Sequence, residues 1–413
     1  MSAVAAEDVQ RHLLAEPIDY TSVLDAFEGD KLLDVSVGVS FRRRQEHSTI
    51  ARERTGESDT IGGRTVPVVQ SREVTTSLSL DLAVGVWHDL MVYGRLPLVL
   101  SDTRTLRQAD GVTADMAKSA LVGGAGDDNN APLFERTFTS ATRSGIPALE
   151  FGVAWGVFNQ YVTDYLPTWV LSLETRIGIG KLMAACADGA GCNAGINRGT
   201  ATVALQSRWS YRWRFLEPYL GLRYADEIAT GASDNFNPHG AAPSDLNPSP
   251  PSVYELTGGA SLIAWEDRRR FQRLWIDVRG FASYVSAGRD YSALYDALGT
   301  STNPQLRVPY QTASGTVTEN GLTNVASYAR LRAEITLGTQ AARYVRFRAG
   351  IGLSHVTSHL LTDAAACIAS GDGSCPADRV NSLYRPVIDL PGQRFVQTGE
   401  LTFDVFADAT GQF

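Results

Sequence analysis

Charged residues recur at every second position within several apolar segments of this 413-residue sequence. Arg330, Arg332 and Glu334 alternate with apolar residues, and Arg346 and Arg348 repeat the pattern a little further along the chain. Because successive side chains of a β-strand point to opposite faces, this spacing gives a strand one charged face and one apolar face. The chemistry that such a charged face offers is electrostatic, since it orders water and discriminates solutes by charge and size.

Charged residues occupy the polar face of expected strands along most of the chain. They are Asp81, Glu174, Arg176, Arg208, Arg279, Arg330, Arg332, Glu334, Arg346, Arg348 and Asp404. Arginines and carboxylates are interleaved among them, so we expect them to line one common lumen and to set its selectivity. The alternative is a lumen that ion pairs close and stiffen.

A second kind of chemistry is suggested by the segment that holds His355, Thr357 and His359. The three residues are expected on one face, in an arrangement similar to the His and Ser of barrel phospholipases. Threonine is a poorer nucleophile and no Asn or Asp that would orient the histidine is assignable, so polar residues at a strand end are the favoured interpretation. The spacing of the two histidines and Asp363 is also weak as a metal-binding pattern. We therefore predict no catalytic residue, no metal site and no cofactor.

The composition limits the class of protein to which the chain belongs. It is 44% hydrophobic and 20% charged, which is too apolar for a disordered chain. Its net charge of −8 lacks the basic excess of a nucleic-acid-binding protein. No run approaches the roughly 18 apolar residues of a transmembrane helix.

Alternation of apolar and polar residues continues through nearly the whole chain after residue 30 and predicts about twelve strands. They are expected near 32–46, 70–87, 90–102, 147–160, 166–181, 198–213, 216–228, 252–266, 271–287, 325–338, 342–357 and 395–412. Short links between them alternate strictly with long links rich in Gly, Pro and Asn. This alternation is typical of the turns and surface loops of a membrane barrel.

We therefore predict an all-β fold, a transmembrane up-and-down antiparallel β-barrel of about twelve strands over residues 30–413. A soluble β-sandwich also alternates, but its strands usually have only about five or six residues. Aromatic residues near the expected strand ends are typical of interfacial girdles. They are Trp87, Trp209, Tyr211, Trp213, Tyr219, Tyr254, Tyr284 and Tyr344.

The four cysteines form two local pairs in long links. Cys186 and Cys192 flank the stretch ADGAG, and Cys367 and Cys375 flank IASGDGS. Neither pair has the spacing of a zinc site. The economical interpretation is two loop disulfides formed in an oxidising compartment, with free thiols as the alternative.

The last segment, 401–413, resembles the C-terminal β-signal of Gram-negative outer-membrane proteins. Phe403 and Val405 share a face with the terminal Phe413, although Gly411 stands where that family often has an aromatic residue. This resemblance implies recognition by the barrel-assembly machinery. The segment 78–102 resembles the strand–turn–strand of uncharacterised transporter-like barrels grouped with the phenol-degradation putative channel family, and that resemblance implies a solute channel.

The N-terminal residues 1–29 are expected to form a periplasmic extension, in which a short helix fits 7–15. Residues 3–6, Ala-Val-Ala-Ala, resemble the end of a signal-peptide cleavage site. We therefore expect a mature protein of the bacterial outer membrane, with a cytoplasmic protein as the alternative from this segment alone. Two segments are candidates for closing the lumen, namely 7–28 and the long loop 103–146, in which a helical turn is expected at 114–121.

Together these patterns predict a porin-like channel, not an enzyme, that passes small solutes through an Arg-rich lumen. The other expected partners are outer-membrane lipid and lipopolysaccharide, whose phosphates the run Arg42-Arg43-Arg44 would meet near the outer rim. No nucleic-acid partner is expected. Two other functions stay open: a closed barrel whose surface loops bind a partner, and a lipid hydrolase that uses His355.

Overall fold

The computed structural model describes most of the chain. The described residues are 20–24, 34–53, 65–113, 121, 132–160, 163, 165–230, 235–236, 249–267, 269–306, 310–312, 315–317, 320–342, 344–367, 381 and 383–413. Among them, no helix is both long enough and apolar enough to cross a membrane.

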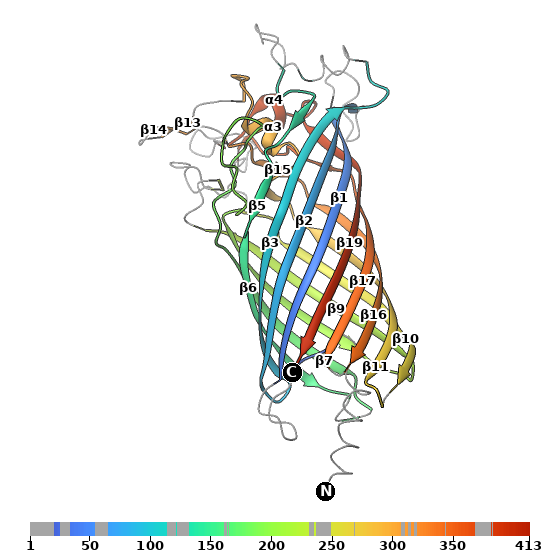
Figure 1. The fold of residues 1–413 in the computed structure, drawn as a ribbon. Helices are drawn as coiled ribbons and strands as arrows, with labels where there is room; N and C mark the ends of the chain where they lie inside the picture. The colour runs from blue at the N-terminus through green and yellow to red at the C-terminus, as the bar shows by residue number, and fades with distance from the viewer. Residues whose placement is uncertain are drawn as a thin grey trace, which may run out of the picture.

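Twelve antiparallel strands form a closed barrel, as the sequence predicted (Figure 1). They are β1 (Val35–Glu53), β2 (Thr65–Trp87), β3 (Leu90–Gln108), β6 (Ala148–Phe158), β7 (Thr168–Gly178), β8 (Thr200–Ser210), β9 (Leu216–Ala229), β10 (Val253–Asp267), β11 (Gln272–Val285), β16 (Tyr328–Ala342), β17 (Val345–Val356) and β19 (Phe395–Gln412). Each pairs with the next along the chain, and β1 pairs with β19 to close the wall. The short links lie with the C-terminus at one end, here called the turn end; the long links lie at the opposite loop end.

The first three strands are longer than the sequence predicted. They have 19, 23 and 19 residues, and they extend beyond the expected limits at residues 46, 70 and 102. A strand of about 9–11 residues suffices to cross a bilayer. The extra length rises past the apolar outer surface, and its apolar residues, among them Ile50, Val68 and Leu106, are buried in a cluster at this end of the barrel.

The outer face of the barrel is apolar. Leu80 and Leu82 are 57% and 51% exposed, and similar side chains occupy the outward positions of the other strands. Water would not tolerate so large an exposed apolar surface, whereas a bilayer requires it. The fold is therefore a membrane-spanning barrel.

Aromatic side chains flank this apolar band. Tyr224, Tyr254 and Tyr284 form a row on neighbouring strands, with ring centroids 5.0 and 6.2 Å apart. Trp87 and Trp213 are exposed at the turn end. Such girdles are usual at membrane interfaces.

The described parts of the long links pack together at the loop end. Helices α3 (Tyr295–Gly299) and α4 (Pro386–Asp389) lie there beside the top of the barrel (Figure 1). Short strands accompany them: β4 (Phe138–Thr139), β5 (Arg143–Gly145), β12 (Gly288–Asp290), β13 (Tyr310–Thr312), β14 (Gly315–Val317), β15 (Thr323–Val325) and β18 (His359–Leu360). Leu298 of α3 and Ile388 of α4 join one buried apolar cluster with Ile50 and Leu106 of the barrel wall. We call this assembly the cap.

The C-terminal residues of the expected assembly signal lie on the outer face. Phe403, Val405 and Phe413 are 49%, 41% and 62% exposed. The ring of Phe413 stacks on Tyr344 with centroids 6.3 Å apart. Their recognition by the assembly machinery stays a prediction.

The outer face yields a test with Leu80→Arg. A cation at the middle of the apolar band costs about 2–4 kcal/mol, so we expect the free energy of unfolding to fall by that amount. Chemical denaturation of the protein in lipid vesicles measures it, with Leu80→Phe as a control that keeps the face apolar. An unchanged free energy for Leu80→Arg would show that Leu80 does not contact hydrocarbon.

Candidate functional site

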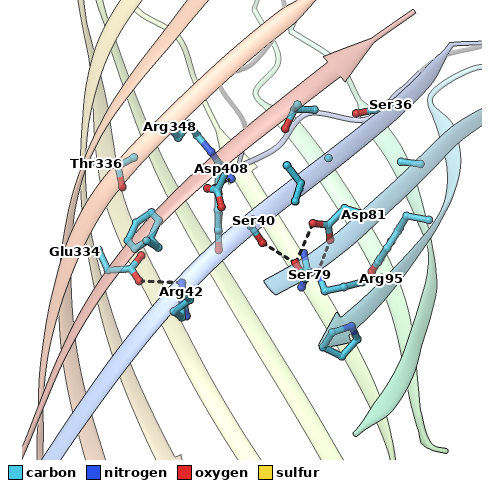
Figure 2. Close-up of a pocket in the computed structure, with 18 of the residues that line it drawn as sticks. Ser36, Ser40, Arg42, Ser79, Asp81, Arg95, Glu334, Thr336, Arg348 and Asp408 are labelled. Carbon is cyan, nitrogen blue, oxygen red and sulfur yellow. Dashed lines mark hydrogen bonds and ion pairs between the residues drawn. The ribbon is translucent and has the colours of Figure 1, made fainter. Parts of the chain in front are cut away.

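The barrel encloses a cavity of about 700 Å³, walled by inward-facing side chains (Figure 2). Five arginines and six carboxylates line it: Arg42, Arg95, Arg208, Arg279, Arg348, Asp81, Glu174, Glu255, Asp277, Glu334 and Asp408. Serine and threonine hydroxyls and a few aromatic rings complete the lining. The cavity surface is thus polar, and its charges nearly cancel.

One group of ion pairs joins β1, β16 and β19. Arg332 contacts Glu334 on its own strand and donates to Asp404 at 2.7 Å. Arg42 approaches the same two carboxylates at 3.9 and 3.7 Å. Two arginines therefore share two acids, which leaves little net charge on this side of the lumen.

A second group lies across β2, β3, β6 and β7. Arg95 is 2.5 Å from Asp81 and 3.7 Å from Glu150. Arg176 approaches Glu150 from the other side at 3.5 Å. Positive and negative side chains alternate around the wall, so the arginines and the acids do not gather on opposite sides.

Asp277 of β11 is the centre of a third, buried group. Its carboxylate accepts hydrogen bonds from the hydroxyls of Tyr219 at 2.8 Å and Ser261 at 2.5 Å. Arg279 lies 3.3 Å from this carboxylate and donates to the Tyr219 hydroxyl at 2.9 Å. The expectation that Tyr219 belongs to an interfacial girdle is therefore wrong. Tyr219 is four residues from the inward-facing Arg223 on the same strand, so it also faces inward. Its position in the alternation, and not its aromatic character, decides on which side of the wall it lies.

The N-terminal segment 20–24 lies inside the barrel. The ring of Tyr20 packs against Tyr219 with centroids 4.6 Å apart, and the Arg279 guanidinium lies 5.0 Å from its centroid. Arg208 donates to the Tyr20 carbonyl at 2.7 Å. Gly221 makes this approach feasible, since a Cβ there would clash with the Tyr20 hydroxyl.

Two further contacts hold the same segment. Thr21 is buried and its hydroxyl is 2.6 Å from that of Ser210. The Leu24 amide donates to the Met91 sulfur at 3.5 Å. Only these five residues of the expected periplasmic extension 1–29 are described, and the helix expected at 7–15 lies outside the described residues.

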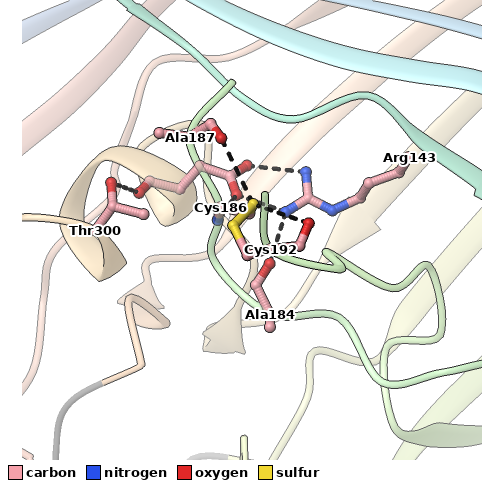
Figure 3. The surroundings of a disulfide bond; sticks show 7 residues. Arg143, Ala184, Cys186, Ala187, Cys192 and Thr300 are labelled. Atoms are coloured by element: carbon pink, nitrogen blue, oxygen red, sulfur yellow. Dashed lines mark hydrogen bonds and ion pairs between the residues drawn. A yellow bond between two sulfur atoms is a disulfide. The ribbon is translucent and has the colours of Figure 1, made fainter. Parts of the chain in front are cut away.

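At the loop end, a buried ion pair docks α3 of the cap. Arg143 and Asp296 are 0% and 2% exposed, and their side chains approach to 2.5 Å. The Cys186 amide donates to the same carboxylate at 3.1 Å, so the pair also fixes the disulfide loop (Figure 3). The predicted Cys186–Cys192 disulfide is confirmed. Cys367 is also disulfide-bonded, and Cys375 lies outside the described residues, as does most of the helical turn expected at 114–121.

The predicted lumen residues fall into two groups. Six of them line the cavity: Asp81, Glu174, Arg208, Arg279, Glu334 and Arg348. The other five occupy inward positions of the wall without lining the cavity itself: Arg176, Arg330, Arg332, Arg346 and Asp404.

Several lining residues were missed. Arg95, Glu255 and Asp408 have the inward parity of their strands, so the alternation alone was enough to find them. Tyr20 carries no such signal, because it reaches the lumen from a segment remote in sequence.

The histidine segment does not form the expected common face. His355 projects from the outer face of β17, whereas His359 is buried against the Tyr328 ring at 4.3 Å. The difference arises because β17 ends at Val356, so the alternation does not continue to residue 359. Within the described part of the chain, no group of three or more His, Cys, Asp or Glu residues has the arrangement of a metal site.

The fold and its apolar outer face define a transmembrane β-barrel of the kind found in bacterial outer membranes. No family model and no curated protein matches the chain.

Solved structures of outer-membrane barrels are similar to the chain. An outer membrane channel from Pseudomonas putida F1 has 9% identity and a TM-score of 0.46, covering 96% of this chain and 99% of that one. A FadL homologue of Pseudomonas aeruginosa has 9% identity and a TM-score of 0.36, with 92% and 90% covered. The outer membrane protease OmpT from Escherichia coli has 7% identity and a TM-score of 0.31, with 92% and 97% covered. The function therefore has to be argued from the residues of this chain.

The cap pair yields a test with Asp296→Ala. Removing one partner of a buried ion pair typically costs about 3–5 kcal/mol, so we expect the cap to loosen while the barrel stays folded. Limited proteolysis of the folded protein should then cut the cap faster. Asp188→Ala, at an exposed position of the same disulfide loop, is the control. Equal cleavage rates for the two variants would contradict a role of Asp296 in docking the cap.

Proposed function

We propose that this protein is a passive outer-membrane channel for small polar solutes, with the loop end facing the outside of the cell. The observation that carries the proposal is the polar cavity of about 700 Å³ inside a barrel whose outer face is apolar. Charged side chains that face the lumen keep water inside the membrane. They also form hydrogen bonds with polar solutes, which replace part of the water that hydrates these solutes outside.

The charge balance of the lumen favours neutral or zwitterionic solutes. Five arginines face six carboxylates in the cavity lining, so the interior attracts neither anions nor cations strongly. The arginines expected to give selectivity act together with the acids that neutralise them. We therefore propose a channel that discriminates more by size and hydrogen bonding than by net charge.

The segment 20–24 occupies the turn-end part of this path. We propose that it is the main barrier to solute passage and that conduction requires its displacement from Tyr219, Arg208 and Arg279. A closed barrel that displays its cap to a partner is the second candidate. Two observations favour it: the segment 20–24 lies inside the lumen, and buried apolar contacts hold the cap to the barrel wall.

Planar-bilayer recording of the refolded protein tests the channel proposal. We expect discrete conductance steps, and we expect Tyr20→Ala to raise the single-channel conductance on the order of twofold by weakening the hold on the segment. Tyr165→Ala is the matched control, since Tyr165 is 80% exposed at a turn. If the wild type and Tyr20→Ala both fold into barrels and neither conducts, the channel proposal is overturned and the closed barrel is favoured.

Arg332→Gln tests the charge balance. This substitution removes the arginine closest to Glu334 and Asp404 and leaves Arg42 at 3.9 and 3.7 Å from them. We expect the reversal potential under a salt gradient to shift toward greater cation preference. Arg269→Gln, at an exposed turn, should leave it unchanged. A shift toward anion preference would contradict the proposed pairing.

A further inference from the structure

Three arginines project from the outer face of the barrel beyond its apolar band. Arg43 on β1, Arg72 on β2 and Arg107 on β3 are exposed at outward positions of the three longest strands. The sequence had suggested the whole run Arg42-Arg43-Arg44 as a contact for phosphate. The alternation instead turns Arg42 and Arg44 into the barrel, where both approach carboxylates.

The strand register brings these arginines together. Arg72 pairs with His47 on one side and with Thr105 on the other. Arg107 is two residues along from Thr105 and therefore diagonal to Arg72 on the same face. Arg43 is four residues along from His47, a distance of about 13 Å. The paired outward positions between Arg43 and Arg72 are Gln45 of β1 and Val74 of β2.

The outward arginines differ from the inward ones in their pairing. On the same strands, the inward Arg44 and Arg104 lie 3.4 and 2.8 Å from Glu46 and Glu73. In the described part of the chain, no carboxylate forms an ion pair with Arg43, Arg72 or Arg107. Within the described residues, the inward Arg44 and Arg104 are thus paired with carboxylates, whereas the outward Arg43, Arg72 and Arg107 are not.

The height of the cluster indicates where its counter-ions are. Directly below Arg43, the paired outward positions Phe41 of β1 and Leu78 of β2 are apolar, and Phe41 is 38% exposed. The cluster thus lies where headgroups of the loop-end leaflet meet the band. Guanidinium groups bind phosphate through paired hydrogen bonds, and a lipid phosphate is held at this level by its acyl chains.

We propose that Arg43, Arg72 and Arg107 form a binding site for the phosphate groups of lipopolysaccharide in the outer leaflet. The acyl chains of the lipid pack on the apolar outward side chains of β1 and β2 below the site. The span from Arg43 to the other two arginines accommodates two phosphates of one disaccharide headgroup. This site is independent of the lumen and of solute passage.

The test measures binding of lipid A to the refolded full-length protein in detergent. We expect bisphosphorylated lipid A to bind, and its dephosphorylated form to bind at least about tenfold more weakly. The triple variant Arg43→Gln, Arg72→Gln, Arg107→Gln should lose affinity for bisphosphorylated lipid A by a similar factor. The matched control is Arg214→Gln, Arg269→Gln, Arg270→Gln, which removes three arginines from the turn end and should bind like the wild type.

Folding of each variant is checked by heat-modifiable mobility and by conductance, which these outward residues should not change. If the triple variant does not fold, Arg72→Gln alone should weaken binding about threefold. Equal binding by the wild type and the folded variant, or equal binding of both lipid forms, would overturn the proposal. Displacement of lipid A by millimolar inorganic phosphate would also overturn it, because the site would then be a general anion patch.

Discussion

Closure of the wall between the first and last strands is the constraint on which this structure depends. Hydrocarbon offers no partner to a backbone N–H or C=O, so a membrane sheet has to pair both of its edges. Here β1 meets β19, and the final residue takes part: Val35 and Phe413 exchange backbone hydrogen bonds at 3.1 and 2.8 Å. This pairing fixes the register of the seam, and with it the side of the wall on which each residue of these two strands lies.

Once the wall is closed, the enclosed charges have to compensate one another. Arg332 and Glu334 of β16 and Asp404 of β19 illustrate this, because Arg332 contacts both carboxylates and the two acids are only 8% and 4% exposed. A buried or half-buried ion that loses its partner is costly, so arginines and carboxylates occur inside in nearly equal number. Outside and beyond the apolar band, Arg72 forms no ion pair with a carboxylate of the described residues, and in the proposed site lipid phosphate is its counter-ion.

The two ends of the barrel hold their associated segments by different physical means. At the turn end, the five residues 20–24 are held by one aromatic ring, two guanidinium groups and a hydroxyl contact. At the loop end, an apolar cluster joins the wall, and the buried Arg143–Asp296 pair orients α3 beside the disulfide loop. The first set of contacts is small and local, whereas the second is part of a core. The turn-end segment is therefore the easier of the two to displace.

The sequence by itself determined the barrel. Period-two alternation, long loops separated by short turns and an apolar terminal strand were enough to predict twelve strands, and to place Arg332, Glu334 and Asp404 on the inner face, because these signals are local. Only the tertiary structure decided which charges pair, since the partners of Arg95 or Asp277 depend on register across strands. It alone placed Tyr20 against Tyr219 and His359 away from His355. Such contacts join segments that are remote in the sequence and share no local pattern, so they cannot be predicted before the fold of the barrel is known.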